Sequence, residues 1–169
     1  MVKFKFSKSD IIVLIIAAMI VICSVFVIKP VIVKESSMEP TLQDGNFLLI
    51  DRVSKPKKGD IVIFKSDVDG GKLLVKRIIA TDGEEIKVED TSVYLNGEKL
   101  DEPYIKDQSY RYEENKSWDV PKDSIFVMGD NREVSLDSRY DQVGCVNKSK
   151  IVGKVLVRLY PFGEMGKVN

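Results

Sequence analysis

The sequence of 169 residues contains no histidine. A serine–histidine–aspartate triad therefore cannot form within this chain, and imidazole cannot bind zinc or iron. The two cysteines, Cys23 and Cys145, are separated by charged sequence and form no CxxC motif, so we expect no disulfide between them. The chain holds 26 basic and 26 acidic residues, and this balance gives no argument for binding nucleic acid.

One long hydrophobic segment, Ile11 to Ile28, lies near the N-terminus and carries no charge. A helix of this length, at about 1.5 Å per residue, reaches ~27 Å and nearly matches the ~30 Å hydrocarbon core of a bilayer. Few soluble helices are apolar on every face, and the run is longer than the apolar part of a cleaved secretory signal. We therefore predict an uncleaved transmembrane anchor over residues 11–28, extended into the interface by Pro30 to Val33.

Lysines on either side of this segment set its expected orientation. Three lysines precede the segment and two follow it, so the positive-inside rule places residues 1–10 in the cytoplasm. Residues 29–169 then form an extracytoplasmic domain, which is long enough to have its own core. The expected location is the cell membrane with a single pass, and no feature of the sequence sets the oligomeric state.

Short apolar runs rich in β-branched and aromatic residues follow the predicted anchor, with turn residues between them. They are 47–50, 61–64, 73–80, 93–95, 125–128 and 151–160. Asn96-Gly97 is typical of a type I′ hairpin turn because both residues accept positive φ. The predicted fold class is mostly β: one N-terminal transmembrane helix, then a compact and largely antiparallel β-sheet domain.

The polar segment 101–122 is predicted to be an exposed excursion from this sheet. It contains Trp118, the only tryptophan. We favour the interpretation that Trp118 packs on the β core as part of a lid. The alternative is an aromatic side chain at the membrane interface.

A serine pair, Ser36-Ser37, stands shortly after the hydrophobic segment and just ahead of Pro40, which fixes the local backbone. A serine in this place is either an ordinary turn residue or a nucleophile that works at the bilayer surface. Because histidine is absent, lysine is the only common base left for a serine hydroxyl.

Lys76 is the candidate base, because it lies in a predicted strand whose two-residue alternation gives it apolar neighbours on the same face. These neighbours are Leu74, Ile78 and Ala80. Burial disfavours the charged amine and lowers its pKa towards neutrality, so Lys76 could accept a proton from a serine. The alternative is that Lys76 extends its amine into solvent, or that Arg77 points outward instead.

The segment from Gly129 to Arg139 is dense in Asp, Asn, Ser and Arg and directly follows an apolar run. It is either a solvated loop or a supporting shell for a nearby site. In the second case Asp137 and Arg139 are close enough in the sequence to pair, and Ser135 is free to orient a base.

A divalent-metal site built from Asp130, Asn131 and Asp137 is an alternative for the same segment. Arg132 and Arg139 would compete for those carboxylates, and the segment lacks the ligand spacing of an EF-hand. We therefore expect no metal and no other cofactor.

Four segments together resemble the successive sequence boxes of bacterial type I signal peptidases, in the order of that family. They are SMEPTL at 37–42, GDIVIF at 59–64, KRII at 76–79 and GDNREVSLDSR at 129–139. With the N-terminal hydrophobic segment, the resemblance covers essentially the whole chain. The chain has little room for the larger inserted β domain of some relatives, so it resembles the compact form common in Gram-positive bacteria.

The resemblance implies a membrane-anchored serine endopeptidase that removes signal peptides from exported preproteins by a Ser-Lys dyad. By position, Ser37 would be the nucleophile and Lys76 the general base. The residues implied to support the site are Ser135, which orients the lysine, the pair Asp137 and Arg139, and Gly129 and Asp130 in the same loop. Those implied to shape substrate binding are Met38, next to the nucleophile, and Pro40, in its turn.

The implied substrate is an extended peptide with small side chains at the first and third positions before the cut. The implied partners are signal peptides of secreted preproteins and the lipid bilayer. Glu35 stands where some members of the family have a serine that donates to the oxyanion. The backbone N–H of Ser37 would therefore need another donor beside it.

Two other readings remain open. A self-cleaving repressor of the Ser-Lys type would require an N-terminal DNA-binding helical domain, whereas this N-terminus is a hydrophobic segment. A catalytically silent or narrow-client membrane-anchored paralogue would fit the fold, but retention of both Ser37 and Lys76 is unexpected for a silent one.

Overall fold

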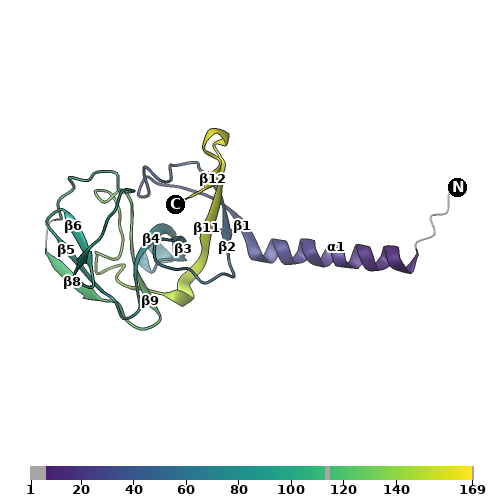
Figure 1. The fold of residues 1–169 in the computed structure, drawn as a ribbon, viewed down its shortest axis with the longest axis horizontal. Helices are drawn as coiled ribbons and strands as arrows, with labels where there is room; N and C mark the ends of the chain where they lie inside the picture. The colour runs from purple at the N-terminus through teal and green to yellow at the C-terminus, as the bar shows by residue number, and fades with distance from the viewer. Residues whose placement is uncertain (1–6, 113–114, 169) are drawn as a thin grey trace.

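A computed structural model describes residues 7–112 and 115–168, without side chains at 20, 22–26 and 69. The described chain folds into one long helix followed by strands in two sheets (Figure 1). All strand pairs are antiparallel, as in the β1–β2 and β5–β6 pairs. The predicted fold class, a mostly β and antiparallel domain, is therefore confirmed. Short 3-10 helices occur at Val68–Gly70, Lys148–Lys150 and Phe162–Glu164.

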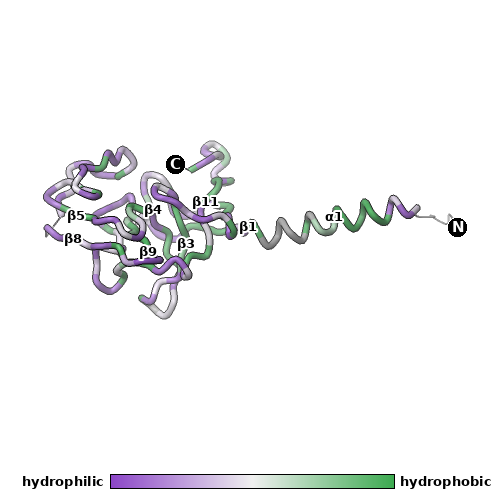
Figure 2. The backbone as a smooth tube through the Cα atoms, turned by 60° about the horizontal axis from the view of Figure 1, so that its bottom comes forward, coloured by the Kyte–Doolittle hydropathy of each residue, from purple (hydrophilic) through white to green (hydrophobic). Residues whose placement is uncertain are grey.

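Helix α1 (Lys8–Val27) projects away from the sheets, and its described residues are largely hydrophobic (Figures 1 and 2). At its start, the Ser7 backbone N–H donates to the Asp10 carboxylate at 2.8 Å. The large apolar side chains from Ile11 to Ile16 are exposed. Among residues 7–112 and 115–168, no helix combines the length and the hydropathy that crossing a membrane requires. The transmembrane anchor predicted at residues 11–28 is therefore not confirmed.

Strand β1 (Ile28–Ile32) begins at the last residue of the predicted anchor. It pairs with β2 (Phe47–Asp51), with Pro30 opposite Leu49. Residues 30–32, which the sequence assigned to the membrane interface, thus belong to the edge of a sheet. A proline is tolerated there because an edge strand leaves one side of its backbone unpaired.

The larger sheet has the strand order β1-β2-β11-β3-β4-β9-β10, and β12 pairs with β11. Its other strands are β3 (Ile61–Lys65), β4 (Leu73–Thr81), β9 (Ser124–Met128), β10 (Val146–Asn147), β11 (Ile151–Tyr160) and β12 (Gly166–Lys167). The predicted runs at 47–50, 61–64, 73–80, 125–128 and 151–160 all lie within strands of this sheet.

The smaller sheet has the order β7-β6-β5-β8. Its strands are β5 (Glu85–Glu89), β6 (Ser92–Leu95), β7 (Glu98–Lys99) and β8 (Lys116–Asp119). Asn96 and Gly97 join β6 to β7 with φ of 51° and 84°, which confirms the predicted hairpin turn.

Strand β8 corrects the prediction that 101–122 is an excursion outside the sheet. The strand pairs with β5, with Trp118 opposite Ile86. Trp118 is half-buried and its ring centroid lies 5.0 Å from that of Phe126 in β9. The structure thus confirms the favoured interpretation that Trp118 packs on the β core.

Strand β4 divides the core, because its apolar residues belong to different clusters. Leu74 and Ile78, the predicted neighbours of Lys76, pack in one cluster with residues of β3 and β9. Ala80 does not share that cluster and packs with Ile79 against the smaller sheet. The register of β4 against β9 shifts between Ile78 and Ala80, and such a bulge breaks simple two-residue alternation.

Candidate active site

Ser37 lies in the tight turn between β1 and β2. The turn closes through backbone hydrogen bonds from Glu39 N–H to the Ser36 carbonyl and from Leu42 N–H to the Met38 carbonyl. Met38 and Leu42 are buried in the core cluster beneath the turn. Two apolar anchors therefore hold the segment whose serine faces the opposite side.

Lys76 of β4 meets this serine directly. Its Nζ donates to Ser37 Oγ at 2.6 Å. The two residues are 39 positions apart in the sequence, and the fold of the sheet brings them together. Lys76 is 1% exposed and Ser37 is 8% exposed. The alternatives in which Lys76 reaches solvent or Arg77 points outward are therefore wrong, since both side chains are buried.

Burial is the main influence on the Lys76 amine and lowers its pKa below the ordinary lysine value. The carboxylates of Asp137 and Glu35 act in the opposite direction, and the positive charge of Arg139 reinforces the lowering. A larger share of Lys76 is thus neutral at a given pH than for an exposed lysine. A neutral amine beside a hydroxyl can take its proton, which makes the oxygen a nucleophile.

The two residues open onto a cavity of about 140 Å³. Its apolar wall includes Leu74, Val134 and Leu136, and its polar residues are Glu35, Ser66 and Lys72. Glu35 and Lys72 form an ion pair of 2.5 Å at this cavity, with both side chains about half exposed. The cavity is therefore mixed in character, with a charged pair near its opening.

Asp137 is the centre of the predicted supporting cluster. Its Oδ2 accepts hydrogen bonds from Ser135 Oγ at 2.7 Å and from the Gly129 backbone N–H at 2.9 Å. Its Oδ1 accepts from Arg139 Nε at 2.8 Å, so the predicted Asp137–Arg139 pair is present. Burial opposes the charged carboxylate, but Arg139 and these hydrogen bonds hold the pKa of Asp137 below its ordinary value.

Gly129 brings this cluster against the serine turn. A Cβ at Gly129 would lie 2.3 Å from Ser135 Oγ and 2.4 Å from the Ser37 carbonyl oxygen, both closer than real contacts. The Asn131 backbone N–H donates to that same carbonyl at 3.1 Å. The hydroxyl of Ser135 donates to Asp137 and not to Lys76, so direct orientation of the lysine by Ser135 stays a prediction.

Asp130 pairs with an arginine outside its own loop, whereas the sequence offered Arg132 and Arg139 within the loop as competitors for its carboxylate. Arg77 Nε and Nη2 contact the two Asp130 oxygens at 2.9 and 2.7 Å, and both side chains are buried. Thr41 Oγ1, from the serine turn, donates to Asp130 at 2.5 Å. Asp130 and Asp137 are thus each paired with an arginine, and no group of three potential metal ligands occurs among the described residues.

Residues next to Ser37 also define its surroundings. Met38 is buried and Pro40 is exposed, so the two predicted substrate-binding residues face different environments. Asn131 Nδ2 donates to the Ser36 carbonyl at 3.1 Å, which adds a third hydrogen bond between the loop after β9 and the serine turn. The sequence marked Asn131 only as a possible metal ligand.

Segment 101–112 makes contacts with the loop after β9 that the sequence did not predict. Glu102 is buried and pairs with Arg132 through Nη2 at 2.6 Å. Arg132 also donates from Nε to the Gly129 carbonyl at 2.9 Å, and the Lys106 backbone N–H donates to the Asp130 carbonyl. The many charged residues of 129–139 indicated a network of ion pairs and hydrogen bonds. The spacing of residues within that segment could not predict Glu102, which lies in a distant polar segment, as a partner.

Comparison with known proteins agrees with this geometry. The family model described as signal peptidase, peptidase S26 matches residues 6–160. Signal peptidase I U of Bacillus subtilis (strain 168) is 37% identical, with 90% of this chain and 87% of the relative covered. Signal peptidase IB of Staphylococcus aureus (strain COL) is 33% identical, with 82% and 81% covered. The crystal structure of a signal peptidase I from Enterococcus faecalis V583 superimposes with a TM-score of 0.53 at 31% identity, covering 60% of this chain and 97% of that one.

The fold and these relatives define the protein as a serine endopeptidase. The expectation drawn from the four sequence boxes is therefore confirmed at the level of the family. The chain belongs to the signal peptidase S26 family.

Proposed function

We propose that this peptidase removes signal peptides from exported preproteins, with Ser37 as nucleophile and Lys76 as general base. The observation that carries the proposal is the 2.6 Å contact between Lys76 Nζ and Ser37 Oγ, two buried side chains at the wall of a cavity. The cavity beside this contact can accept a small side chain of an extended peptide, as the family resemblance implies.

In the proposed mechanism, neutral Lys76 takes the Ser37 hydroxyl proton while Oγ attacks the scissile carbonyl carbon. The tetrahedral intermediate collapses, the C–N bond breaks, and Lys76 gives the proton to the leaving amine. A water molecule then attacks the acyl-enzyme ester as Lys76 takes its proton. Breakdown of that second intermediate returns the proton to Ser37 and releases the carboxylate product.

The cluster around Asp137 supports the two proposed catalytic residues. Asp137 with Arg139, together with Ser135, Gly129 and Asp130, holds the loop that packs on the Ser37 carbonyl. The negative charge of Asp137 also counters the desolvation of Lys76, so the lysine can carry a proton between the two steps. The backbone N–H of Ser37 is the proposed first oxyanion donor. These positions are expected to affect turnover more than substrate affinity.

Membrane attachment is a separate part of the proposal. We infer that residues 1–10 are cytoplasmic, that residues 11–28 anchor the chain and that 29–169 are extracytoplasmic. The exposed apolar side chains of α1, which extends away from the β domain, support this inference. The described residues contain no helix that meets the requirements of a membrane span, so the test must be direct. Release of the full chain from membranes by alkaline carbonate would refute the anchor.

The test of the catalytic proposal is cleavage of a synthetic peptide with an Ala-x-Ala junction by the purified full chain in detergent. We expect cleavage after the second alanine, and none by the Ser37→Ala or Lys76→Met variants. Lys72→Met is the matched control, because Lys72 lines the same cavity but is about half exposed and pairs with Glu35. Turnover by a folded Lys76→Met variant would refute the lysine base, and an inactive wild-type chain would favour a silent paralogue.

A further inference from the structure

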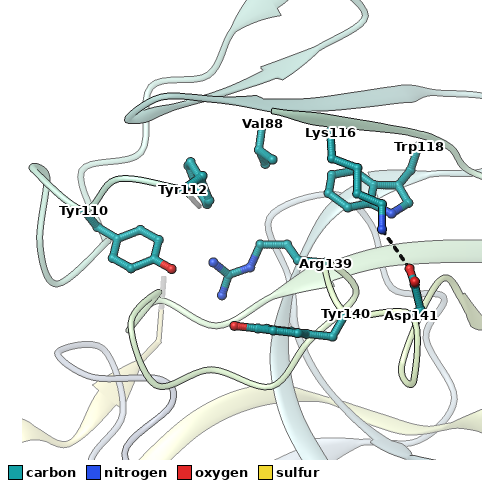
Figure 3. Close-up of a pocket in the computed structure, with 8 residues that line it drawn as sticks. All are labelled: Val88, Tyr110, Tyr112, Lys116, Trp118, Arg139, Tyr140 and Asp141. Carbon is teal, nitrogen blue, oxygen red and sulfur yellow. Dashed lines mark hydrogen bonds and ion pairs between the residues drawn. The ribbon is translucent and has the colours of Figure 1, made fainter. Parts of the chain in front are cut away.

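A second cavity lies between the smaller sheet and the loop after Asp137 (Figure 3). Its volume is about 270 Å³, and it shares no lining residue with the cavity at Ser37 and Lys76. The side chains that give it chemical character are Tyr110, Tyr112, Lys116, Trp118, Arg139 and Tyr140. We call it the tyrosine pocket.

Arg139 supplies the charge that faces this pocket. Its side chain is 7% exposed, and its Nε and Nη2 donate to Asp137 and to the carbonyls of Arg132 and Ser135. Nη1 donates to none of the described residues. Since no fully buried side-chain nitrogen among them lacks a partner, Nη1 keeps some exposure, and Arg139 lines the pocket. Figure 3 shows the guanidinium directed into the space between the tyrosine rings.

Three tyrosine rings surround this guanidinium, with the Arg139 Cζ 5.6 to 5.8 Å from the centroids of Tyr110, Tyr112 and Tyr140. The Tyr112 hydroxyl is bonded to Arg132, whereas the hydroxyls of Tyr110 and Tyr140 bond to no described residue. The pocket therefore offers uncommitted donors: Nη1 and two phenolic hydroxyls. A cationic ligand is disfavoured because the rings already hold one cation.

The other charged groups of the pocket do not cancel these donors. Lys116 pairs with Asp141 at 2.8 Å on the far side, and Lys116 Nζ lies 5.4 Å from the Trp118 ring centroid. Asp137 lies behind Arg139 and is already saturated with hydrogen bonds. An anionic group would thus meet one arginine nitrogen and two hydroxyls, with aromatic rings against its apolar part.

We propose that the tyrosine pocket binds a carboxylate carried on an apolar body, with Arg139 Nη1 and the hydroxyls of Tyr110 and Tyr140 as donors. A volume of about 270 Å³ lies just below the usual range for ligand pockets, which begins at about 300 Å³, and suits one amino-acid-sized group. The carboxylate can come from the free C-terminus of a peptide or from an acidic side chain. The proposal stands independently of the role of Lys76.

Trp118 is the only tryptophan of the chain and lines the pocket, so its fluorescence reports binding there. The full chain carrying Ser37→Ala, in detergent, is titrated with N-acetyl-phenylalanine and with its uncharged amide. We expect a saturable change with the acid and at least ~10-fold weaker binding of the amide, because hydrogen bonds to a charged group are lost. A second comparison uses N-acetyl-glutamyl-phenylalaninamide, whose only carboxylate is a side chain. Binding of this probe would assign the site to acidic side chains as well.

The donors are tested with the double variant Tyr110→Phe/Tyr140→Phe, which keeps both rings. We expect about tenfold weaker binding of N-acetyl-phenylalanine. Tyr160→Phe is the matched control, because Tyr160 is exposed and outside the pocket, and its affinity should equal that of the parent. Equal affinity for acid and amide, no saturable signal with either carboxylate probe, or unchanged affinity in the double variant would overturn the proposal.

Discussion

Replacing Gly129 by alanine is the sharpest test of how the loop after β9 supports the serine turn. Gly129 carries no side chain at the point where the Ser37 carbonyl and the Ser135 side chain meet. An added Cβ would lie 2.4 Å from the Ser37 carbonyl oxygen and 2.6 Å from Ser135 Cβ. The first neighbour is backbone, so it cannot rotate away. The strain must move the turn, the loop or both.

The size of the effect follows from these distances. The Ser37 carbonyl must retreat by roughly 0.6 Å to restore a 3.0 Å contact, and misplacement of reacting groups by about 1 Å costs up to ~10²-fold in rate. We expect kcat/KM of Gly129→Ala to fall by about 10- to 100-fold. Overpacking should also lower the free energy of unfolding by about 1–3 kcal/mol.

Cleavage of the Ala-x-Ala peptide and urea unfolding measure the two effects separately. Gly153→Ala is the matched control, because its Cβ would lie 2.7 Å from the Asp51 carbonyl oxygen, away from Ser37. It should lose stability but keep its kcat/KM, and Gly163→Ala, with open space around it, should change neither. A folded Gly129→Ala enzyme with wild-type kcat/KM, or an equal loss in Gly153→Ala, would refute the reasoning.

Three further predictions concern charge. The kcat/KM should rise from acidic towards alkaline pH as Lys76 loses its proton, and this rise should lie below the ordinary range of lysine, because burial lowers its pKa and only the neutral amine acts as base. Glu102→Gln should lower the free energy of unfolding in urea by about 3–5 kcal/mol, because it leaves Arg132 buried without its counter-charge. The pKa of Asp137 is lowered in the folded state, so its contribution to stability is present above the ordinary value of 3.8 and is lost as the pH falls through the lower folded value. Asp137→Asn should therefore unfold with a shallower dependence of stability on pH in this acidic range.

Each of these has a control. The rise with pH should persist in Lys72→Met, and a flat profile in the wild type would contradict a lysine base. Glu89→Gln breaks the exposed Lys87–Glu89 pair and should leave the urea midpoint unchanged. A urea midpoint of Glu102→Gln equal to that of the wild type would show that the buried Glu102–Arg132 pair does not stabilise the fold. Identical acid unfolding of Asp137→Asn and wild type would show that Asp137 does not contribute to the pH dependence of stability.

Much of the site was predictable because it depends on local pattern and on composition. Alternation of apolar residues predicted β4 and the burial of Lys76, since successive side chains of a strand point to opposite faces. The absence of histidine left lysine as the only common candidate base for Ser37. Asp137 and Arg139 are two residues apart, so their pairing needed only a turn. The Asn96-Gly97 hairpin followed from the positive φ that both residues tolerate.

The remaining features required the tertiary structure, because each depends on segments far apart in the sequence. Asp130 pairs with Arg77 of β4, and Arg132 pairs with Glu102, whereas charge spacing had suggested arginines within the loop. Strand β8 has little apolar signal of its own and is stabilised by pairing with β5. The shift after Ile78, which moves Ala80 to another cluster, is set by the register against β9. Sequence thus determined which residues were suited to be strands and to carry the chemistry. The sheet topology decided which of them meet, because long-range pairing depends on register and strand order.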